Sequence, residues 1–209
     1  MTENLEVYDL EGRLLGTQER DAFYAQNKTE FSLKGEITRQ VRTVRAILIT
    51  SNGRVYIPRR SKIKKENPGL FDKSLGGHVI GSSYDVTLAT EAQQELGITS
   101  LIIPNDEFHS ALRTSNLHSL AIFRAIEDIA PFHSTRITNE GMRFVQPYMN
   151  RFYLGYYDGP VRFEDGECDA IQVFSLDDLR HELSTPHKLT DDLTFMVERY
   201  GNLIVPLKA

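Results

Sequence analysis

Cysteine, tryptophan, long apolar runs and an excess of basic residues are nearly or wholly missing from this sequence. Its one cysteine, Cys168, excludes an internal disulfide and a cysteine-rich zinc site. No stretch approaches the roughly 18 apolar residues of a membrane helix, and the N-terminus lacks the basic and apolar regions of a signal peptide. We therefore expect a cytoplasmic protein with no membrane partner. With 24 Lys and Arg against 29 Asp and Glu, the net charge of −5 disfavours a nucleic-acid partner.

What remains is the composition of a globular domain. The 209 residues are 40% hydrophobic and 25% charged, which suits one domain with at most a small appendage. No internal repeat is visible, so a solenoid is disfavoured. Strand patterns mixed with a few helical ones predict an α/β (α+β) fold, with a sheet covered on both faces. We divide it into an N-terminal extension, residues 1–36, and a main domain, residues 37–209.

Turn and cap residues predict the individual elements. Residues 5–16 read as a β-hairpin, residues 17–26 as a short helix capped by Thr17, and residues 27–36 as a connection. Residues 127–141 read as a second, long connection. Strands are expected at 41–50, 55–61, 100–104, 108–113, 119–126, 142–157 and 170–174, and helices at 84–96, 177–183 and 190–200.

The segment GGHVIGSSYDVTLATEAQQELGI, residues 76–98, joins a glycine-rich loop to a helix. Loop amides and a helix N-terminus suit anions such as phosphate. Glu91 and Glu95 stand four residues apart and share one helix face. Paired carboxylates near glycine carbonyls form an oxygen-ligand site for Mg²⁺ or Mn²⁺, and Mg²⁺ with phosphate is the usual pairing. The simpler alternative is a solvated helix face.

This segment resembles the Nudix box, the signature G-x5-E-x7-R-E-U-x-E-E-x-G-U of the Nudix hydrolases, in which U is aliphatic. Glu91 falls on the Glu of the R-E pair, and Glu95 on the second Glu of the E-E pair. The stretches RRSKIKKENPGLFDKSLGGHV, EVYDLEGRLLGTQERDAFY and AIQVFSLDDL are similar to a subgroup related to isopentenyl-diphosphate isomerase. The resemblance implies a Nudix-type α/β/α sandwich with a mixed β-sheet and an added N-terminal β-hairpin.

Three charged positions of the box are altered in this sequence. Ser82 stands where the first Glu is expected, and Thr90 replaces the Arg. In the family the Arg and the first Glu of the box pair with each other, so the loss of both leaves no unpaired charge. Gln94 replaces the first Glu of the E-E pair and keeps only a neutral carbonyl oxygen. We therefore expect weaker Mg²⁺ binding than an intact box provides.

The resemblance implies a set of site residues. Glu91 and Glu95 are the expected catalytic residues and metal ligands, helped by Gln94 and by a carbonyl of Gly77 or Gly76. Substrate phosphates are expected to meet His78, Gly76 and a basic loop, although a solvated loop is an equal alternative for the latter. The loop residues proposed for substrate binding are Arg59, Arg60, Lys62 and Lys65. A further carboxylate is expected from Glu140, Glu164, Glu167 or Asp169, among which the sequence does not choose.

We predict a metal-dependent hydrolase that cleaves a diphosphate linkage in a nucleoside diphosphate derivative or a related phosphorylated metabolite. One alternative is a Nudix-like module that binds such a ligand without turnover, as the altered box positions suggest. A less favoured alternative is isopentenyl-diphosphate isomerase, because Gly76 stands where that enzyme has its catalytic cysteine. The N-terminal hairpin could pair across a homodimer.

Overall fold

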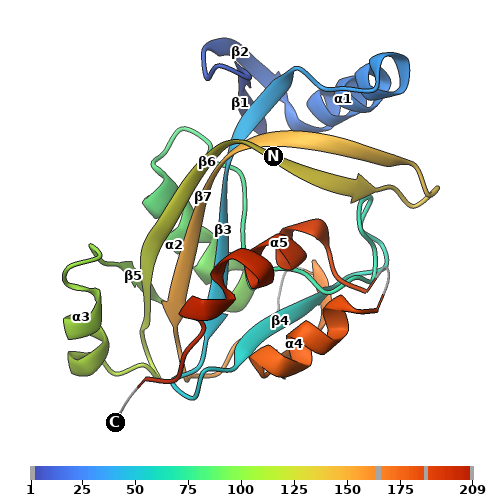
Figure 1. Ribbon diagram of the computed structural model, residues 1–209. Helices are drawn as coiled ribbons and strands as arrows, with labels where there is room; N and C mark the ends of the chain where they lie inside the picture. The colour runs from blue at the N-terminus through green and yellow to red at the C-terminus, as the bar shows by residue number, and fades with distance from the viewer. Residues whose placement is uncertain (1–2, 163–165, 186–187, 208–209) are drawn as a thin grey trace.

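The structure is a computed structural model that describes residues 3–162, 166–185 and 188–207. Within these ranges an eight-stranded sheet runs in the order β2-β1-β3-β7-β6-β5, and β4 branches from β3 and pairs with β8 (Figure 1). The strands are β1 (Asn4–Asp9), β2 (Leu14–Glu19), β3 (Arg39–Ile49), β4 (Val55–Arg60), β5 (Ser100–Ile102), β6 (Ala121–Ile137), β7 (Arg143–Tyr156) and β8 (Cys168–Phe174). The helices are α1 (Arg20–Lys34), α2 (Tyr84–Leu96), α3 (Phe108–Thr114), α4 (Leu176–Leu183) and α5 (Asp191–Tyr200), followed by a 3₁₀ turn, Gly201–Leu203.

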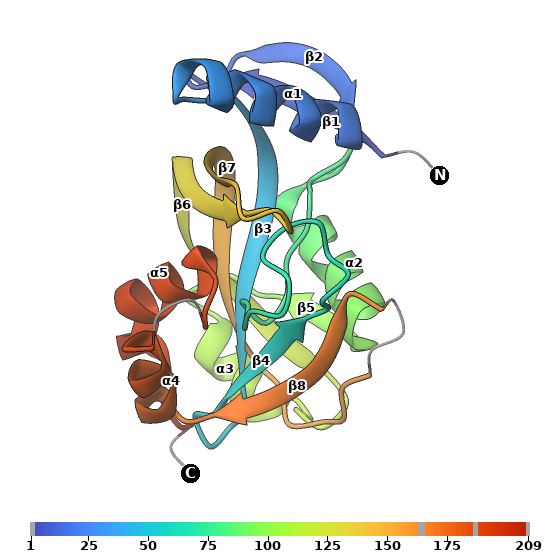
Figure 2. The ribbon, with the colours of Figure 1, turned by 90° about the vertical axis from the view of Figure 1, so that its right-hand side faces the viewer.

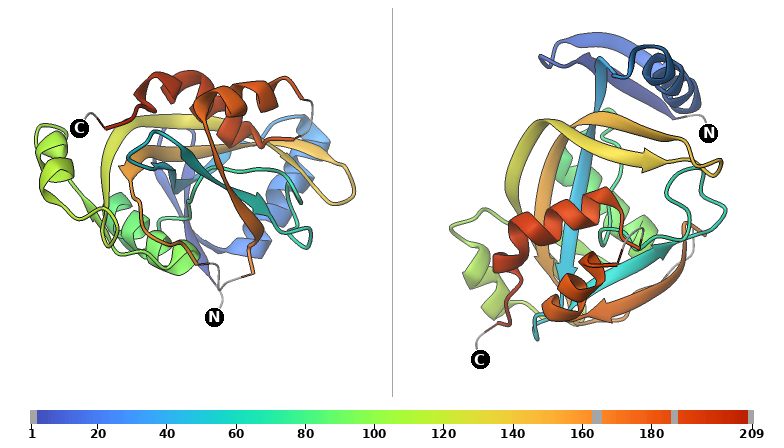
Figure 3. Two further views of the ribbon diagram at one scale, coloured as in Figure 1. Left: turned by 90° about the horizontal axis from the view of Figure 1, so that it is seen from below. Right: turned by 45° about the vertical axis from the view of Figure 1, so that its right-hand side comes forward.

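Helices cover both faces of this sheet, as the view from below in Figure 3 shows. On one face, Leu179 of α4 and Leu193 of α5 join a large buried cluster. On the other face, Leu88 and Leu96 of α2 join a second cluster. The sheet is mixed, because β3 pairs with β7 and β5 with β6 in parallel while the other pairs are antiparallel. The predicted layered fold is therefore confirmed. No helix of the described residues is long and apolar enough to cross a membrane.

The N-terminal hairpin extends the central sheet. β1 pairs with β2 on one side and with β3 on the other, where Val7 faces Val41. α1 lies beside this hairpin at one end of the sheet (Figure 2) and buries Phe23 in the larger cluster. The added hairpin is thus present, whereas the division of the chain at residue 36 stays a proposal.

α2 forms where the sequence places its start and stop signals. The Ser83 hydroxyl accepts a hydrogen bond from the Val86 amide at 3.2 Å, and Gly97 ends the helix with a φ of 65°. Ala92 lies on the buried stripe that packs against the sheet. This packing fixes the rotation of α2 and leaves the Glu91 and Glu95 side chains only partly exposed.

Two predictions in the middle of the chain are wrong. Residues 108–113, expected as a strand, belong to α3, which buries Phe108 and Leu112 four residues apart. Residues 127–141, expected as a connection, form the second half of β6 and the start of its turn into β7. This stretch is polar and has no apolar alternation. It becomes a strand because its backbone pairs with β7.

The prediction for the first helix was too short. The helix begins after Glu19, not Thr17, because the Glu19 carboxylate accepts the Ala22 amide at 2.7 Å. It then continues to Lys34, so most of residues 27–36 are helical rather than connecting. Asn27 is fully buried in it and donates to Gln146 at 2.9 Å. The helix therefore buries a polar side chain here, and the hydrogen bond to Gln146 compensates for its removal from water.

Candidate functional site

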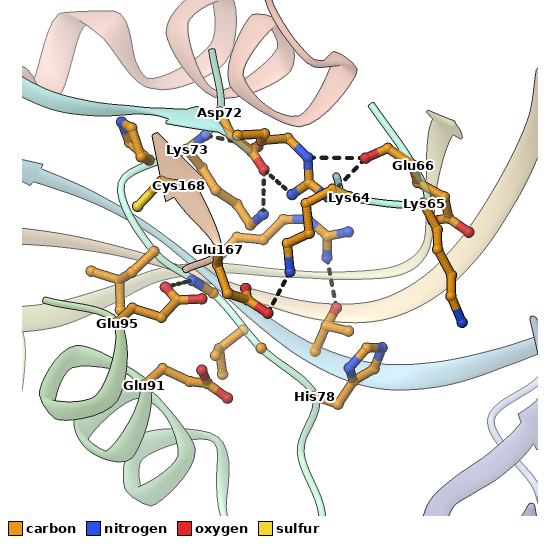
Figure 4. A pocket seen from close by; sticks show the side chains of 18 of the residues that line it. Lys64, Lys65, Glu66, Asp72, Lys73, His78, Glu91, Glu95, Glu167 and Cys168 are labelled. Atoms are coloured by element: carbon orange, nitrogen blue, oxygen red, sulfur yellow. Dashed lines mark hydrogen bonds and ion pairs between the residues drawn. The ribbon is translucent and has the colours of Figure 1, made fainter. Parts of the chain in front are cut away.

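A cavity of about 1210 Å³ lies between α1, α2 and the segment that joins β4 to α2. Small-molecule sites usually occupy about 300–1,000 Å³, so this one has room for a large ligand. α1 contributes Arg20, Tyr24 and Lys28 to its wall, and α2 contributes Glu91 and Glu95. Figure 4 shows part of the lining from close by.

The two α2 carboxylates approach the glycine segment closely. The Gly76 amide donates to Glu95 Oε2 at 3.2 Å. A Cβ built on Gly77 would lie 1.9 Å from Glu91 Oε1, so a side chain at Gly77 would displace this carboxylate. The Gly-Gly pair is therefore what lets α2 bring both glutamates against the loop.

Backbone pairing sets the direction of the glycine carbonyls. The Leu75 and Gly77 carbonyls accept from the Ala46 and Val44 amides of β3 at 3.0 and 2.9 Å. In an extended segment the N–H and C=O of one residue point to the same side, and successive residues alternate. Because the Gly76 amide faces Glu95, the Gly76 carbonyl is directed to the α2 side as well. Of the two glycine carbonyls proposed from the sequence, the one at Gly76 is therefore the better placed.

The carboxylates carry negative charge at an energetic cost. Burial raises the pKa of Glu91 to about 7, and the charge of Glu167 adds to this effect. Burial, followed by repulsion from Glu91, raises the pKa of Glu95 to about 8. The Lys73 ammonium offsets both effects only in part. A cation placed between the two carboxylates would relieve this strain.

The donor set fits a small divalent ion. Among the described residues, no group of three or more His, Cys, Asp or Glu side chains is arranged to hold a metal. Mg²⁺ often needs fewer, because it keeps several waters and is bound through one or two carboxylates plus substrate phosphates. Glu91, Glu95 and the Gly76 carbonyl are oxygen donors of this kind.

The residues proposed for the substrate divide into two groups. Arg60, His78 and Gly76 line the cavity, as does Lys65, whose ammonium lies 2.9 Å from the exposed Asp21 carboxylate. Gln94, proposed as a metal ligand, lines it too. Arg59 and Lys62 lie outside its lining. Of the late carboxylates, Glu167 lines the cavity and contacts Lys64. Asp169 and the exposed Glu140 do not line it, and Glu164 falls outside the described residues.

Sequence reasoning missed a buried charge network behind the cavity. Its central carboxylate, Asp192 of α5, is fully buried and lies 2.8 Å from Arg45 and 3.1 Å from Arg136. Lys73 bridges Asp192 and Asp72, at 3.6 and 3.3 Å. The one available signal was Arg45 itself, an arginine inside the apolar strand pattern VRAILI.

His78 is held neutral at the α1 side of the cavity. Its Nε2 lies 2.7 Å from the Tyr24 hydroxyl. Burial, helped by the charges of Arg20 and Arg45, lowers the pKa of His78 to about 3. This imidazole therefore contributes hydrogen bonding to the site, and no charge, at neutral pH.

His78 should make the metal-free protein lose stability as pH falls. Between about pH 6.5 and pH 3 the unfolded chain binds a proton at this site that the folded chain excludes, and the slope approaches about 1.4 kcal/mol per pH unit. Arg136 and Lys73 face the same ring, which adds to the exclusion. Denaturant unfolding with EDTA at about pH 7.5 and pH 5 measures this loss. We expect the wild type to lose about 2 kcal/mol more than His78→Gln; equal losses in both proteins would contradict the assignment.

Comparison with known structures defines the fold class. The Nudix domain of Shewanella oneidensis NrtR, solved with ADP ribose, matches with a TM-score of 0.51 at 14% identity, over 85% of this chain and 98% of that chain. DR0079 from Deinococcus radiodurans matches with a TM-score of 0.67 at 21% identity, over 94% and 98%. These likenesses show that the chain has the Nudix fold.

Sequence comparison points to the same family. An uncharacterized Nudix hydrolase of Nostoc sp. (strain PCC 7120) is 31% identical over 102 residues, 47% of this chain and 54% of that protein. A Nudix hydrolase of Deinococcus radiodurans is 39% identical over 88 residues, 41% and 50% respectively. The chain thus spans about half the length of the curated relatives it matches. No family model matches the chain. The chain thus has the Nudix fold and is similar to Nudix hydrolases over less than half of its own sequence.

Proposed function

We propose that this protein is a metal-dependent hydrolase that cleaves a diphosphate linkage in a nucleoside diphosphate derivative or a related phosphorylated metabolite. The observation that carries this proposal is the placement of Glu91 and Glu95 against Gly76 and Gly77 in a cavity lined by basic side chains. The kinship with Nudix hydrolases supports it. A phosphorylated small molecule is the proposed partner, in line with the ADP ribose bound to the NrtR domain.

Each residue of the site has a proposed role. Glu91, Glu95 and the Gly76 carbonyl hold Mg²⁺ or Mn²⁺. Such an ion polarises a phosphoryl oxygen and lowers the pKa of bound water. The Glu91 carboxylate lines the cavity and is the proposed acceptor of the proton of the attacking water. Gln94 is exposed at the cavity and offers a neutral oxygen, so we expect weak metal binding.

The altered box positions favour a second candidate function, a binding module without turnover. Ser82 lies 2.8 Å from the Thr87 hydroxyl, and Thr90 donates to the Val86 carbonyl at 2.9 Å. Both side chains are thus engaged within the loop and helix and not with the glutamates. The Nudix domain of NrtR, which has the same fold, was solved in complex with ADP ribose.

The isomerase alternative depends on a cysteine. Gly76 stands at the expected position, and Cys168 lines the cavity from the first residue of β8. Membership of the isomerase-related subgroup stays a prediction, as do a cytoplasmic location and a homodimer formed through the hairpin. Isopentenyl diphosphate incubated with the protein and Mg²⁺ should give no dimethylallyl product.

The decisive experiment measures phosphate release from nucleoside diphosphate sugars, dinucleotides and nucleoside triphosphates with Mg²⁺ or Mn²⁺. The matched controls are Glu95→Gln, which neutralises the site, and Glu140→Gln, which neutralises an exposed glutamate outside it. Turnover that needs metal, disappears in the first variant and persists in the second supports the hydrolase. Ligand-dependent thermal shifts without any turnover would favour the binding module.

Gly77→Ala should reduce activity without unfolding the protein. The new Cβ overlaps only the end of the flexible Glu91 side chain, which must move away. A displacement of about 1 Å in a catalytic group can lower the rate about 100-fold. We expect a loss of kcat/KM of that order with a thermal midpoint close to the wild type.

Gly76→Ala is the contrasting variant. Its Cβ would lie 2.5 Å from the Val44 carbonyl oxygen, which is backbone of β3 and cannot yield easily. This substitution should lower the unfolding free energy by about 1–3 kcal/mol. Circular dichroism melts and steady-state assays on both variants make the comparison. Full activity in Gly77→Ala would show that Glu91 is not needed where it stands.

A further inference from the structure

Four cationic side chains on the inner wall of the cavity form ion pairs with only two carboxylates, Asp72 and Asp192. We call Arg45, Arg60, Lys73 and Arg136 the cation cluster; all four line the cavity. Arg45, Arg136 and Lys73 surround Asp192, as described above. Arg60 lies 2.9 Å from Asp72, which also accepts from Thr190 at 2.8 Å. The buried wall therefore retains two positive charges that its own carboxylates do not balance.

The other carboxylates of the lining either pair with cations outside the cluster or, like Glu91 and Glu95, lie on α2. Glu66 lies 2.9 Å from Lys28, so this pair is neutral as a unit. Unbalanced buried charge is costly, and proteins usually relieve it with a counter-ion.

One donor of the cluster has no hydrogen-bond partner in the part of the chain that the structure describes. Arg136 is 7% exposed and lines the cavity, and its buried Nε–H has no hydrogen-bond acceptor among the described residues. The Arg136 guanidinium therefore borders the cavity with part of its hydrogen-bonding capacity unused among the described residues.

The arginine beside it is fixed in advance. The Arg45 guanidinium lies 4.4 Å from the Tyr148 ring centroid and 4.9 Å from that of Phe132. It also donates to Thr43 Oγ1 at 2.6 Å and Asn150 Oδ1 at 2.5 Å. These contacts hold the cation in one orientation before any ligand binds, which lowers the entropy lost on binding.

The cluster is distinct from the carboxylate end of the cavity. Arg45 on β3 and Arg136 on β6 both contact Asp192 of α5. Glu91 and Glu95 lie on α2, where Glu95 accepts from the Gly76 amide. Figure 4 shows Lys73 and Asp72 across the cavity from the two glutamates. The two arginines therefore belong to the inner end of the cavity.

We propose that the cation cluster binds a phosphate group of the substrate other than the diphosphate held at Glu91 and Glu95. A phosphomonoester carries about −1.5 to −2 charge at neutral pH and offers three acceptor oxygens, which matches the two charges by which the cluster's cations exceed Asp72 and Asp192. A carboxylate supplies only one charge. The part of this inference that concerns the substrate rests on the proposed function: the substrate is a diphosphate compound that bears an additional phosphomonoester.

Inorganic phosphate tests the cluster without any turnover. Titration calorimetry on the metal-free protein in EDTA should show saturable binding of one phosphate per chain. Arg136→Gln should weaken this binding at least about tenfold, since a charge-assisted bond is lost. Arg136→Lys, which keeps the ion pair with Asp192 but removes the guanidinium donors, should weaken it less and is the test variant if the first does not fold.

Two controls locate the bound phosphate. Glu95→Gln changes the other end of the cavity, and Glu140→Gln removes an exposed charge outside the cavity lining. Both should bind phosphate within about twofold of the wild type. No saturable binding, or binding that changes with Glu95→Gln and not with either Arg136 variant, would overturn the proposal.

Matched substrate pairs test the consequence for specificity. ADP-ribose and its 2′-phosphate differ by one phosphomonoester, as do dephospho-coenzyme A and coenzyme A. In at least one pair, kcat/KM should be about tenfold higher for the member with the extra phosphate, and Arg136→Gln should remove the difference. Equal values in both pairs would overturn the substrate assignment. Phosphate binding at the cluster without hydrolysis of any compound would instead count against the hydrolase.

Discussion

Replacing Glu95 by glutamine is expected to abolish metal-dependent turnover while stabilising the metal-free protein. The glutamine removes a charge that the proposed site needs for its ion, and with it several kcal/mol of transition-state stabilisation. We expect kcat/KM to fall at least about 100-fold. Glu140→Gln, outside the cavity, should leave it unchanged.

The stability change has the opposite sign because of the raised pKa of Glu95. Burial and Glu91 raise this pKa to about 8, so the folded chain holds a proton at pH values where the unfolded chain has lost it. Wild-type stability is therefore lost as pH rises from about 4.5 through 8, and the ionised glutamate opposes folding above that range. The glutamine variant escapes this penalty.

Thermal unfolding in EDTA at about pH 8.5 measures the effect. The variant should be about 2 kcal/mol more stable, which corresponds to a midpoint roughly 4–8 °C higher. Added Mg²⁺ should raise the midpoint of the wild type and not that of the variant. A variant less stable than the wild type without metal would mean that Glu95 has a structural role instead.

The carboxylate end of the site could be predicted because its signals are local. Ser83 and Gly97 bound α2, and the spacing of Glu91 and Glu95 places them on one face. The close approach to Gly76 and Gly77 then follows from residues only about fifteen to twenty positions apart. The layered fold and the N-terminal hairpin could be predicted for the same reason, from turns and caps within short windows.

The cation cluster could not be predicted because its members come from distant segments. Arg45 lies on β3, Arg136 on β6 and Asp192 on α5, and tertiary packing alone brings them together. The part of β6 that carries Arg136 was interpreted as a connection, since it lacks an apolar alternation. Its strand structure depends on pairing with β7, for example Arg136 with Phe144. Non-local pairing of this kind leaves little trace in a single sequence.

Asp192→Asn should be the most destabilising single substitution at this network. Asp192 is fully buried; burial alone would raise its pKa, but the charges of Arg136 and Arg45 hold it well below its usual range, so it stays ionised at neutral pH. Removing its charge leaves three buried cations with one carboxylate fewer. Loss of one partner of a buried ion pair costs about 3–5 kcal/mol. Urea unfolding at neutral pH measures the loss. The matched control is Asp191→Asn on the same helix turn. The Asp191 carboxylate accepts a hydrogen bond from the Thr135 amide.

The same substitution connects stability to the proposed phosphate site. In Asp192→Asn the unbalanced positive charge on the cavity wall rises from two to three, so an added anion has more to compensate. Phosphate should therefore raise the unfolding free energy of this variant more than that of the wild type, by about 1 kcal/mol at a saturating concentration. Sulfate should do the same, whereas chloride at equal ionic strength should not. If phosphate stabilises the variant no more than the wild type, then Asp192 and the bound anion do not share the same cations. In that case the imbalance on the inner wall would be relieved by some means other than a ligand.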